Sequence, residues 1–140
     1  MRPLEEGALI ETDVLCDYLV SDKPSLLRML LRNVPCYTTV INAAELFSVV
    51  HNEHERLCVH NLLGGLRVMG LNARYAITIG NLTREAREAG CKISERDAII
   101  AGTCVASRLP IVTIRWKEKY RALNSVRVVS STELSEFNKN

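Results

Sequence analysis

The sequence predicts an α/β fold with three layers, in which helices cover both faces of a five-stranded, mostly parallel sheet. Short apolar runs alternate along the chain with longer segments whose apolar residues recur at helical spacing. The apolar runs lack the polar alternation of a strand that faces water, as expected for strands buried on both sides. Parallel neighbours need crossover connections, and the helical segments provide them.

The first half of the chain supplies two of the expected strands. Residues 7–12, GALIET, are a short apolar run that ends in polar residues, and DVLCDYLV after it has helical spacing. Residues 35–40, PCYTTV, are short, β-branched and aromatic, which favours a second strand. Further helices are expected at residues 24–33, with Pro24 near the first turn, and at residues 41–52 and 53–63.

The second half supplies the other three strands. Residues 66–71 follow the break at Gly64-Gly65 and predict a short third strand. Residues 109–114, LPIVTI, and residues 126–130, VRVVS, predict the fourth and fifth. Helices are expected at residues 73–90, ending in Gly90 as the glycine after the helix, and at residues 94–108.

Length and composition favour one domain over residues 1–140. A chain of 140 residues with 47% hydrophobic residues can bury a sizeable core. We expect this core to span residues 8–130 and residues 131–140 to form a frayed C-terminal tail. The start has no apolar signal region, and no stretch approaches the roughly 18 uncharged apolar residues of a spanning helix, so we expect no membrane association.

Cysteine usage and charge limit the cellular context. The five cysteines are odd in number, scattered and never in a C-x-x-C pair, which favours buried thiols in a reducing compartment. We therefore expect a cytoplasmic protein. The formal net charge of +2 is too small to indicate an anionic partner, so an argument for nucleic acid must rest on local clustering.

Two acidic residues of the first half fall where parallel sheets place their chemistry, outside the carboxyl ends of strands. Asp13 directly follows the first expected strand, and its structural alternative is to cap the helix beginning at Val14. Glu45 shares a helical face with Ile41 and Val49, which places a carboxylate among apolar neighbours. A buried carboxylate needs a cationic partner or a metal ion, whereas a carboxylate at the rim of the helical face stays in contact with water.

A third acid, Asp97, lies at the end of a helical stripe with Ile100. Its structural alternative is a capping box, because SERD at residues 94–97 has that spacing. All the same, Asp13, Glu45 and Asp97 fall where strand and helix ends should meet at one edge of the sheet. Such a cluster would hold a hard cation such as Mg²⁺ or Mn²⁺, and phosphodiester hydrolysis is the natural reaction for that site.

Four segments in combination resemble the successive signatures of the PIN domain, especially the VapC-like toxin nucleases. They are ALIETDVLCDYL, TTVINAAELFSVV, GCKISERDAIIAGTCVA and LPIVT, in the family's order, and they span roughly residues 8–129. The resemblance implies a metal-dependent ribonuclease with a five-stranded parallel sheet. It also implies a homodimer and, for a toxin member, a cognate antitoxin that holds it inactive.

The resemblance also implies roles for individual residues. The acid after the first strand is matched by Asp13, the acid of NAAEL by Glu45, and the acid that opens DAIIAG by Asp97. These three would be the catalytic residues and the ligands of Mg²⁺ or Mn²⁺. Thr12 matches the polar residue often found beside the first acid.

One position departs from the family pattern. The family usually places a fourth acid, or an asparagine, two residues after the threonine that ends the fourth strand, but Thr113 is followed here by Ile114 and Arg115. Arg115 should lie near Asp13, where it could pair with the carboxylates and compete with a metal, or grip the scissile phosphate. Glu118 is near enough in sequence to be a displaced fourth ligand.

More basic residues and the only tryptophan follow Arg115. Lys117, Lys119 and Arg121 could form an RNA-backbone track beside the site or simply a solvated face. Trp116 could stack on a base or cap the sheet edge. The sequence thus predicts a Mg²⁺- or Mn²⁺-dependent endoribonuclease, the toxin of a toxin–antitoxin pair. The rival is a catalytically inactive PIN domain that binds RNA or a protein, because Arg115 replaces the fourth acid.

Overall fold

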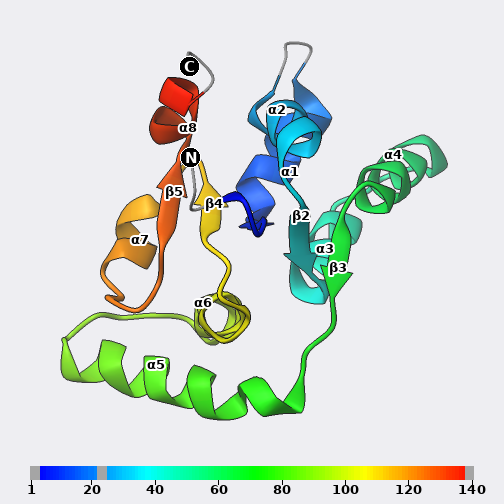
Figure 1. Ribbon diagram of the computed structural model, residues 1–140. Helices are drawn as coiled ribbons and strands as arrows, with labels where there is room; N and C mark the ends of the chain where they lie inside the picture. The colour runs from blue at the N-terminus through cyan, green and yellow to red at the C-terminus, as the bar shows by residue number, and fades with distance from the viewer. Residues whose placement is uncertain (1–3, 22–24, 138–140) are drawn as a thin grey trace.

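The computed structural model describes residues 4–21 and 25–137, so Pro24 lies outside the described residues. All five strands of its sheet are parallel, in the order β3-β2-β1-β4-β5 (Figure 1). The predicted fold class is therefore confirmed. The strands are β1 (Ala8–Ile10), β2 (Cys36–Thr39), β3 (Arg67–Met69), β4 (Ile111–Thr113) and β5 (Val128–Ser130).

Helices cover both faces of the sheet, because successive side chains of a strand point to opposite sides. In β1, Ala8 and Ile10 pack into one hydrophobic core and Leu9 into the other, and all three are fully buried. The first core is completed by α1 (Thr12–Val20), α2 (Leu26–Asn33), α3 (Val40–Ser48), α4 (Glu53–Gly64) and α8 (Ser131–Phe137). The second is completed by α5 (Ala76–Glu88), α6 (Glu95–Ser107) and α7 (Lys117–Arg121).

The order of the strands reverses between β1 and β4. From β1 the chain moves outward to β2 and β3, and it then returns to place β4 and β5 on the other side of β1 (Figure 1). Ile10 of β1 lies beside Val112 of β4 in parallel register. The loops that follow these two strands diverge, so a crevice is expected at their carboxyl ends.

The first strand ends two residues earlier than its apolar run suggests. Glu11 directly follows β1, and its carboxylate accepts a hydrogen bond from the backbone N–H of Thr12 at the start of α1. Glu11 is therefore the N-cap of α1. The expectations that Asp13 directly follows the strand and that it could cap a helix beginning at Val14 are both wrong, because Asp13 lies within the first turn of α1.

The basic stretch after β4 is a helix. β4 ends at Thr113, and the Thr113 hydroxyl accepts a hydrogen bond from the backbone N–H of Trp116 just before α7. Tyr120 of α7 is fully buried and ties this short helix to the core. The alternation of basic residues along the sequence therefore does not continue the strand.

The segment after β5 is not a frayed tail over its described length. Residues 131–137 form α8, and Leu134 is fully buried in the first core. The Ser130 hydroxyl accepts a hydrogen bond from the backbone N–H of Glu133 and donates one to the Glu133 carboxylate at the start of the helix. The prediction of a tail from residue 131 is therefore wrong, and residues 138–140 lie outside the described part of the chain.

Two smaller predictions are confirmed. Gly90 follows α5 with φ +74°, a left-handed conformation that glycine adopts without steric cost. Ser94 caps α6 by accepting a hydrogen bond from the backbone N–H of Asp97. Within residues 4–21 and 25–137, no helix combines the length and the apolar character needed to cross a membrane.

Candidate active site

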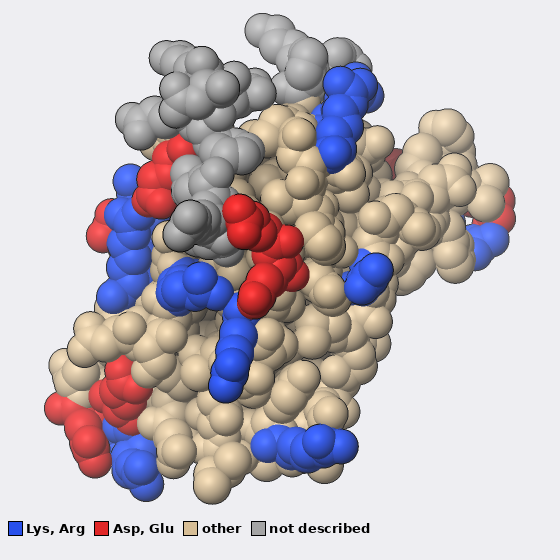
Figure 2. All heavy atoms as spheres, in the orientation of Figure 1, with Lys and Arg blue, Asp and Glu red and all other residues tan. Residues whose placement is uncertain are grey.

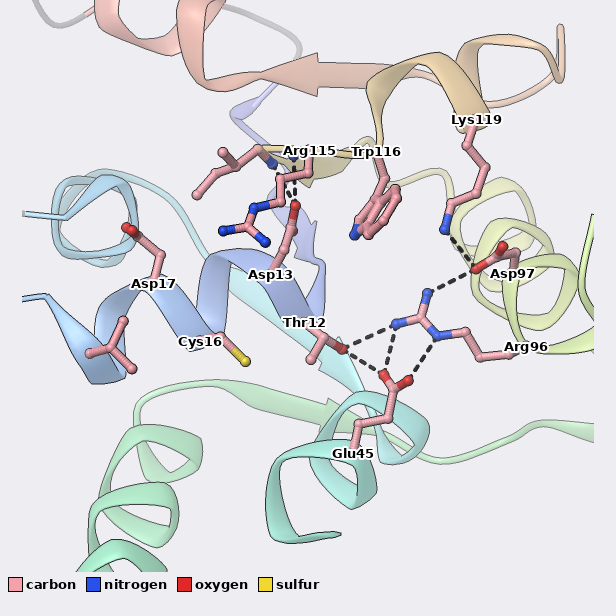
Figure 3. Close-up of a pocket in the computed structure, with 12 residues that line it drawn as sticks. Thr12, Asp13, Cys16, Asp17, Glu45, Arg96, Asp97, Arg115, Trp116 and Lys119 are labelled. Atoms are coloured by element: carbon pink, nitrogen blue, oxygen red, sulfur yellow. Dashed lines mark hydrogen bonds and ion pairs between the residues drawn. The ribbon is translucent and has the colours of Figure 1, made fainter. Parts of the chain in front are cut away.

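A pocket of 490 Å³ opens beside the segments that follow β1 and β4, where the strand order reverses. It brings together residues from α1, α3, α6, α7 and the loop before α7 (Figure 3). The predicted site residues that line it are Thr12, Asp13, Glu45, Asp97, Arg115, Trp116 and Lys119. Thr113, Lys117 and Glu118 are not part of its lining.

A buried ion pair forms the base of this site. The carboxylate of Glu11 is fully buried and accepts hydrogen bonds from both terminal nitrogens of Arg96, at 2.6 and 2.7 Å. The amide of Asn42 and the hydroxyl of Tyr120 also donate to it. Burial alone would raise the pKa of Glu11, but the hydrogen bonds from Arg96 and Tyr120 outweigh it and lower the pKa. Glu11 is therefore a carboxylate at neutral pH.

Glu45 shares the same guanidinium from α3. Its carboxylate accepts a bond from the Nε of Arg96 at 3.1 Å and one from a terminal nitrogen at 2.7 Å (Figure 3). The Thr12 hydroxyl donates to Glu45 at 2.7 Å. The Glu45 side chain is 39% exposed, so it is neither buried among apolar residues nor free in water. Its carboxylate instead forms two hydrogen bonds with the planar guanidinium of Arg96, the bidentate geometry that these two groups commonly adopt.

Asp97 supplies a third carboxylate, from the first turn of α6. Its Oδ1 accepts from Arg96 at 3.0 Å and from the Nζ of Lys119 at 3.0 Å. Burial would raise the pKa of Asp97, but the bonds from Lys119 and Arg96 outweigh it and hold the pKa below its usual range. The backbone N–H of Asp97 therefore donates to the capping residue Ser94, while its carboxylate lines the pocket.

Arg96 is the centre of the cluster. Each of its three guanidinium nitrogens donates to a carboxylate, and the carboxylates come from three separate elements. Burial would lower the pKa of Arg96, but hydrogen bonds to Glu11 and Glu45 outweigh burial and raise the pKa. The side chain is thus held as a cation, with 27% of its surface exposed in the pocket.

Asp13 lies apart from this cluster. Its Oδ2 accepts three hydrogen bonds from the segment after β4: from the Thr113 hydroxyl at 2.8 Å, and from the backbone N–H groups of Ile114 at 3.0 Å and Arg115 at 2.7 Å. Its Oδ1 is buried and has no hydrogen-bond partner among the described residues. Arg115 thus lies near Asp13 as expected, although it makes this contact with its backbone and not with its guanidinium.

The rim of the pocket carries the candidate RNA contacts. The guanidinium of Arg115 lines the pocket, where Figure 3 shows it above α1, and it makes no ion pair with any residue in the described ranges. Trp116 is 45% exposed, and the Nζ of Lys119 lies 4.5 Å from the centre of its ring. Lys119 is already paired with Asp97. On the visible described surface in Figure 2, Lys and Arg side chains form small separate groups, several beside acidic ones.

Glu11, Arg96 and Tyr120, which bond to one another in the carboxylate cluster, have no place in the sequence prediction. Glu11 could have been found as the first acid after the apolar run, had the strand been ended at Ile10. Arg96 carries no such signal, because an arginine in the first turn of a helix is ordinarily solvated. Glu11, and not Asp13, is the acid that directly follows the first strand.

The predicted cofactor can be tested against this arrangement. Carboxylate oxygens are the ligands that Mg²⁺ and Mn²⁺ prefer, so Glu11, Glu45 and Asp97 have suitable chemistry. Their oxygens, however, already bind the guanidinium of Arg96. Over the described residues, no three Asp, Glu, His or Cys side chains are placed to hold a metal ion. In this conformation the site does not fit the cation.

Comparison with known proteins gives matches in structure alone. No protein-family model matches the sequence, and a search of curated proteins finds no match. A chain of VapBC2 from Rickettsia felis, solved bound to a DNA fragment from the promoter, is 20% identical over 88% of this chain and 97% of that chain, with a TM-score of 0.78.

Two further solved structures match in the same way. A chain of a toxin–antitoxin complex from Klebsiella pneumoniae is 20% identical over 86% of this chain and 95% of its own length, with a TM-score of 0.69. A chain of VapBC-5 from Mycobacterium tuberculosis, a member of the VapBC family of toxin–antitoxin systems, is 19% identical. The match covers 88% of this chain and 97% of that chain, with a TM-score of 0.66. At such identities the likeness establishes the fold, and activity must be argued from the site. The chain therefore has the PIN-domain fold that its sequence predicts, and it shares this fold with chains of VapBC toxin–antitoxin complexes.

Proposed function

We propose that this chain is an endoribonuclease of the PIN type and the toxin component of a toxin–antitoxin pair. The observation that carries the proposal is the convergence of three carboxylates, Glu11, Glu45 and Asp97, on one cationic group beside the strand-order reversal. Parallel sheets bind ligands at that point. A cluster of carboxylates that gathers a positive charge there is suited to phosphodiester hydrolysis.

RNA is the proposed substrate, and Arg115 and Trp116 are its proposed contacts. Arg115 is a pocket cation without an ion-pair partner in the described residues, so its guanidinium is available to a phosphate. Trp116 offers an exposed ring on which a base can stack.

The proposed cofactor is Mg²⁺ or Mn²⁺. When bound, such a cation polarises phosphoryl oxygens and supplies hydroxide near neutral pH. The carboxylates would be free to hold it only after Arg96 has left them. Asp13 stays a candidate ligand, because one of its oxygens is buried without a partner among the described residues.

The proposed partners are a cognate antitoxin and a second copy of the chain. Beside the active-site pocket, an apolar hollow of 400 Å³ lies between α1, α3 and α4. Val20 and Val49 line it and are 81% and 63% exposed. Apolar surface of this kind marks sites of protein association. The matched structures are described as complexes with antitoxins, which supports a partner of that class.

The test is cleavage of single-stranded RNA by the purified chain with Mn²⁺, with and without a chelator. Glu45→Gln should lose cleavage, because it removes a charge from the cluster and leaves a side chain of the same shape. Glu118→Gln is the matched control, since Glu118 is exposed and lies outside the pocket lining. RNA binding without cleavage over a range of Mn²⁺ concentrations would support the rival, an inactive PIN domain.

A further inference from the structure

The cation at the centre of the carboxylate cluster belongs to the chain itself. Arg96 binds Glu11 and Glu45 through two hydrogen bonds each, and it binds Asp97 through one. Glu11 approaches from the end of β1 and Glu45 from α3, while Asp97 is the next residue along α6. The guanidinium therefore fills the position on which all three carboxylates converge. Figure 3 shows its contacts with Glu45 and Asp97.

The charges of the cluster require a cation at the position on which the carboxylates converge. Glu11, Glu45 and Asp97 carry three negative charges, and Arg96 and Lys119 together carry two positive ones. Lys119 bonds only to Asp97 in this group. Without Arg96, Glu11 would be a fully buried carboxylate with no cation beside it, and such a group is strongly disfavoured.

We propose that Arg96 is the resident counter-ion of the carboxylate cluster and closes the cluster to divalent cations, so that a metal ion enters only in exchange for the Arg96 side chain. The inference rests on the proposed function, because it describes how that same site is regulated. When a metal ion replaces the guanidinium, a positive charge remains beside Glu11. The Arg96 side chain can move into the pocket, because 27% of its surface is already exposed there.

Removing the Arg96 charge should therefore create a metal site. We expect Arg96→Gln to bind Mn²⁺ at least about tenfold more tightly than the wild-type chain, because the metal no longer has to displace the guanidinium; tenfold corresponds to about 1.4 kcal/mol. Isothermal titration calorimetry with Mn²⁺ alone, and with Mg²⁺ alone, measures the change.

The matched control is Arg121→Gln. It also removes a cation, but Arg121 pairs with Glu133 and does not line the pocket. Its Mn²⁺ affinity should equal that of the wild-type chain. Equal affinities for the wild-type chain and Arg96→Gln would overturn the inference, and so would an Arg96→Gln chain that binds no Mn²⁺.

Arg96→Gln leaves Glu11 unpaired, so the variant needs a second readout in case it folds poorly. Mn²⁺ should restore its circular dichroism spectrum, whereas NaCl of the same ionic strength should not. Failure of Mn²⁺ to restore an unfolded variant would reject the inference. In the double variant Arg96→Gln, Glu45→Gln, the gained affinity should fall, and an unchanged affinity would place the metal elsewhere and also reject it.

Binding and cleavage together separate this inference from the proposed function. Tighter Mn²⁺ binding by Arg96→Gln, with no RNA cleavage by either chain, would sustain the counter-ion role and reject the nuclease. RNA cleavage by the wild-type chain, with equal Mn²⁺ affinities for both chains, would sustain the nuclease and reject the counter-ion role.

Discussion

The side chain of Arg96 joins the buried carboxylate of Glu11 to the surface of the pocket. Two hydrogen bonds, at 2.6 and 2.7 Å, form the contact, and Glu11 has no exposed surface at all. The pair is therefore both a part of the core and the floor of the candidate site. A change at this pair would therefore affect both the stability of the core and the geometry of the candidate site.

Glu11→Gln should destabilise the fold by about 3 kcal/mol, because it breaks a buried ion pair and leaves part of the guanidinium without its partner. The free energy of unfolding in urea measures the loss. Glu45→Gln removes a partly exposed partner of the same guanidinium and should cost about 1 kcal/mol or less. Equal losses for the two variants would contradict the structural role given to Glu11.

Tyr120→Phe should cost about 1–2 kcal/mol, because the Tyr120 hydroxyl donates to the Glu11 carboxylate inside the core. Thermal unfolding followed by circular dichroism is the measurement. Tyr18→Phe is the matched control, since Tyr18 is partly buried and its hydroxyl makes no hydrogen bond with a described residue. An unchanged melting temperature in Tyr120→Phe would show that the hydroxyl does not support Glu11.

Asp13→Asn should abolish Mn²⁺-dependent RNA cleavage and leave the circular dichroism spectrum and melting temperature close to wild type. The asparagine carbonyl can still accept the bonds from Thr113, Ile114 and Arg115. Its amide replaces the oxygen that has no partner among the described residues, and an amide nitrogen is no ligand for a hard cation. Cleavage at the wild-type rate would remove Asp13 from the catalytic residues.

Arg115→Gln should weaken RNA binding and reduce the slope of log affinity against log salt by about one unit, the change expected for one lost phosphate contact. Binding isotherms at several salt concentrations give the slope. Arg121→Gln is the control, because Arg121 pairs with Glu133 and does not line the pocket. If the two variants give the same slope, Arg115 contributes only general charge.

The chain should be a homodimer at tens of micromolar, an order-of-magnitude choice above common dimer affinities. Exposed apolar residues such as Val20, Val49 and Leu57 offer the surface for association. Sedimentation velocity gives the oligomeric state directly. A monomer throughout that range would count against the dimer and leave the surface to another partner.

The strands and most helices could be predicted because their signals are local. The apolar run at LPIVTI, the capping serine Ser94 and the glycine after α5 each act within a few residues. The end of β1 could not be fixed in the same way. The run GALIET does not show whether the strand ends at Ile10 or at Thr12. The choice of its last residue decides whether Glu11 or Asp13 is the first acid after the strand.

The role of Arg96 could not be predicted for a different reason. Its partners Glu11 and Glu45 come from other elements, so no spacing within α6 reveals them. The helix α8 was missed because its seven residues contain only two apolar ones, Phe137 and the buried Leu134, which is too few to show a helical period. Both failures concern contacts made in three dimensions, and sequence periodicity does not record such contacts.

The central position of β1 has a consequence for the order in which the molecule can assemble. Asp13 and Thr113, which bond across the strand-order reversal, are 100 residues apart, and Glu11 and Arg96 are 85 apart. During synthesis at roughly 5–20 residues per second, β1 would wait about 5–20 s for its second neighbour to be made. Until then its edge toward β4 is open, and Glu11 has no cation. A nascent chain therefore completes this site only after β4 has been made, about 100 residues after the first turn of α1.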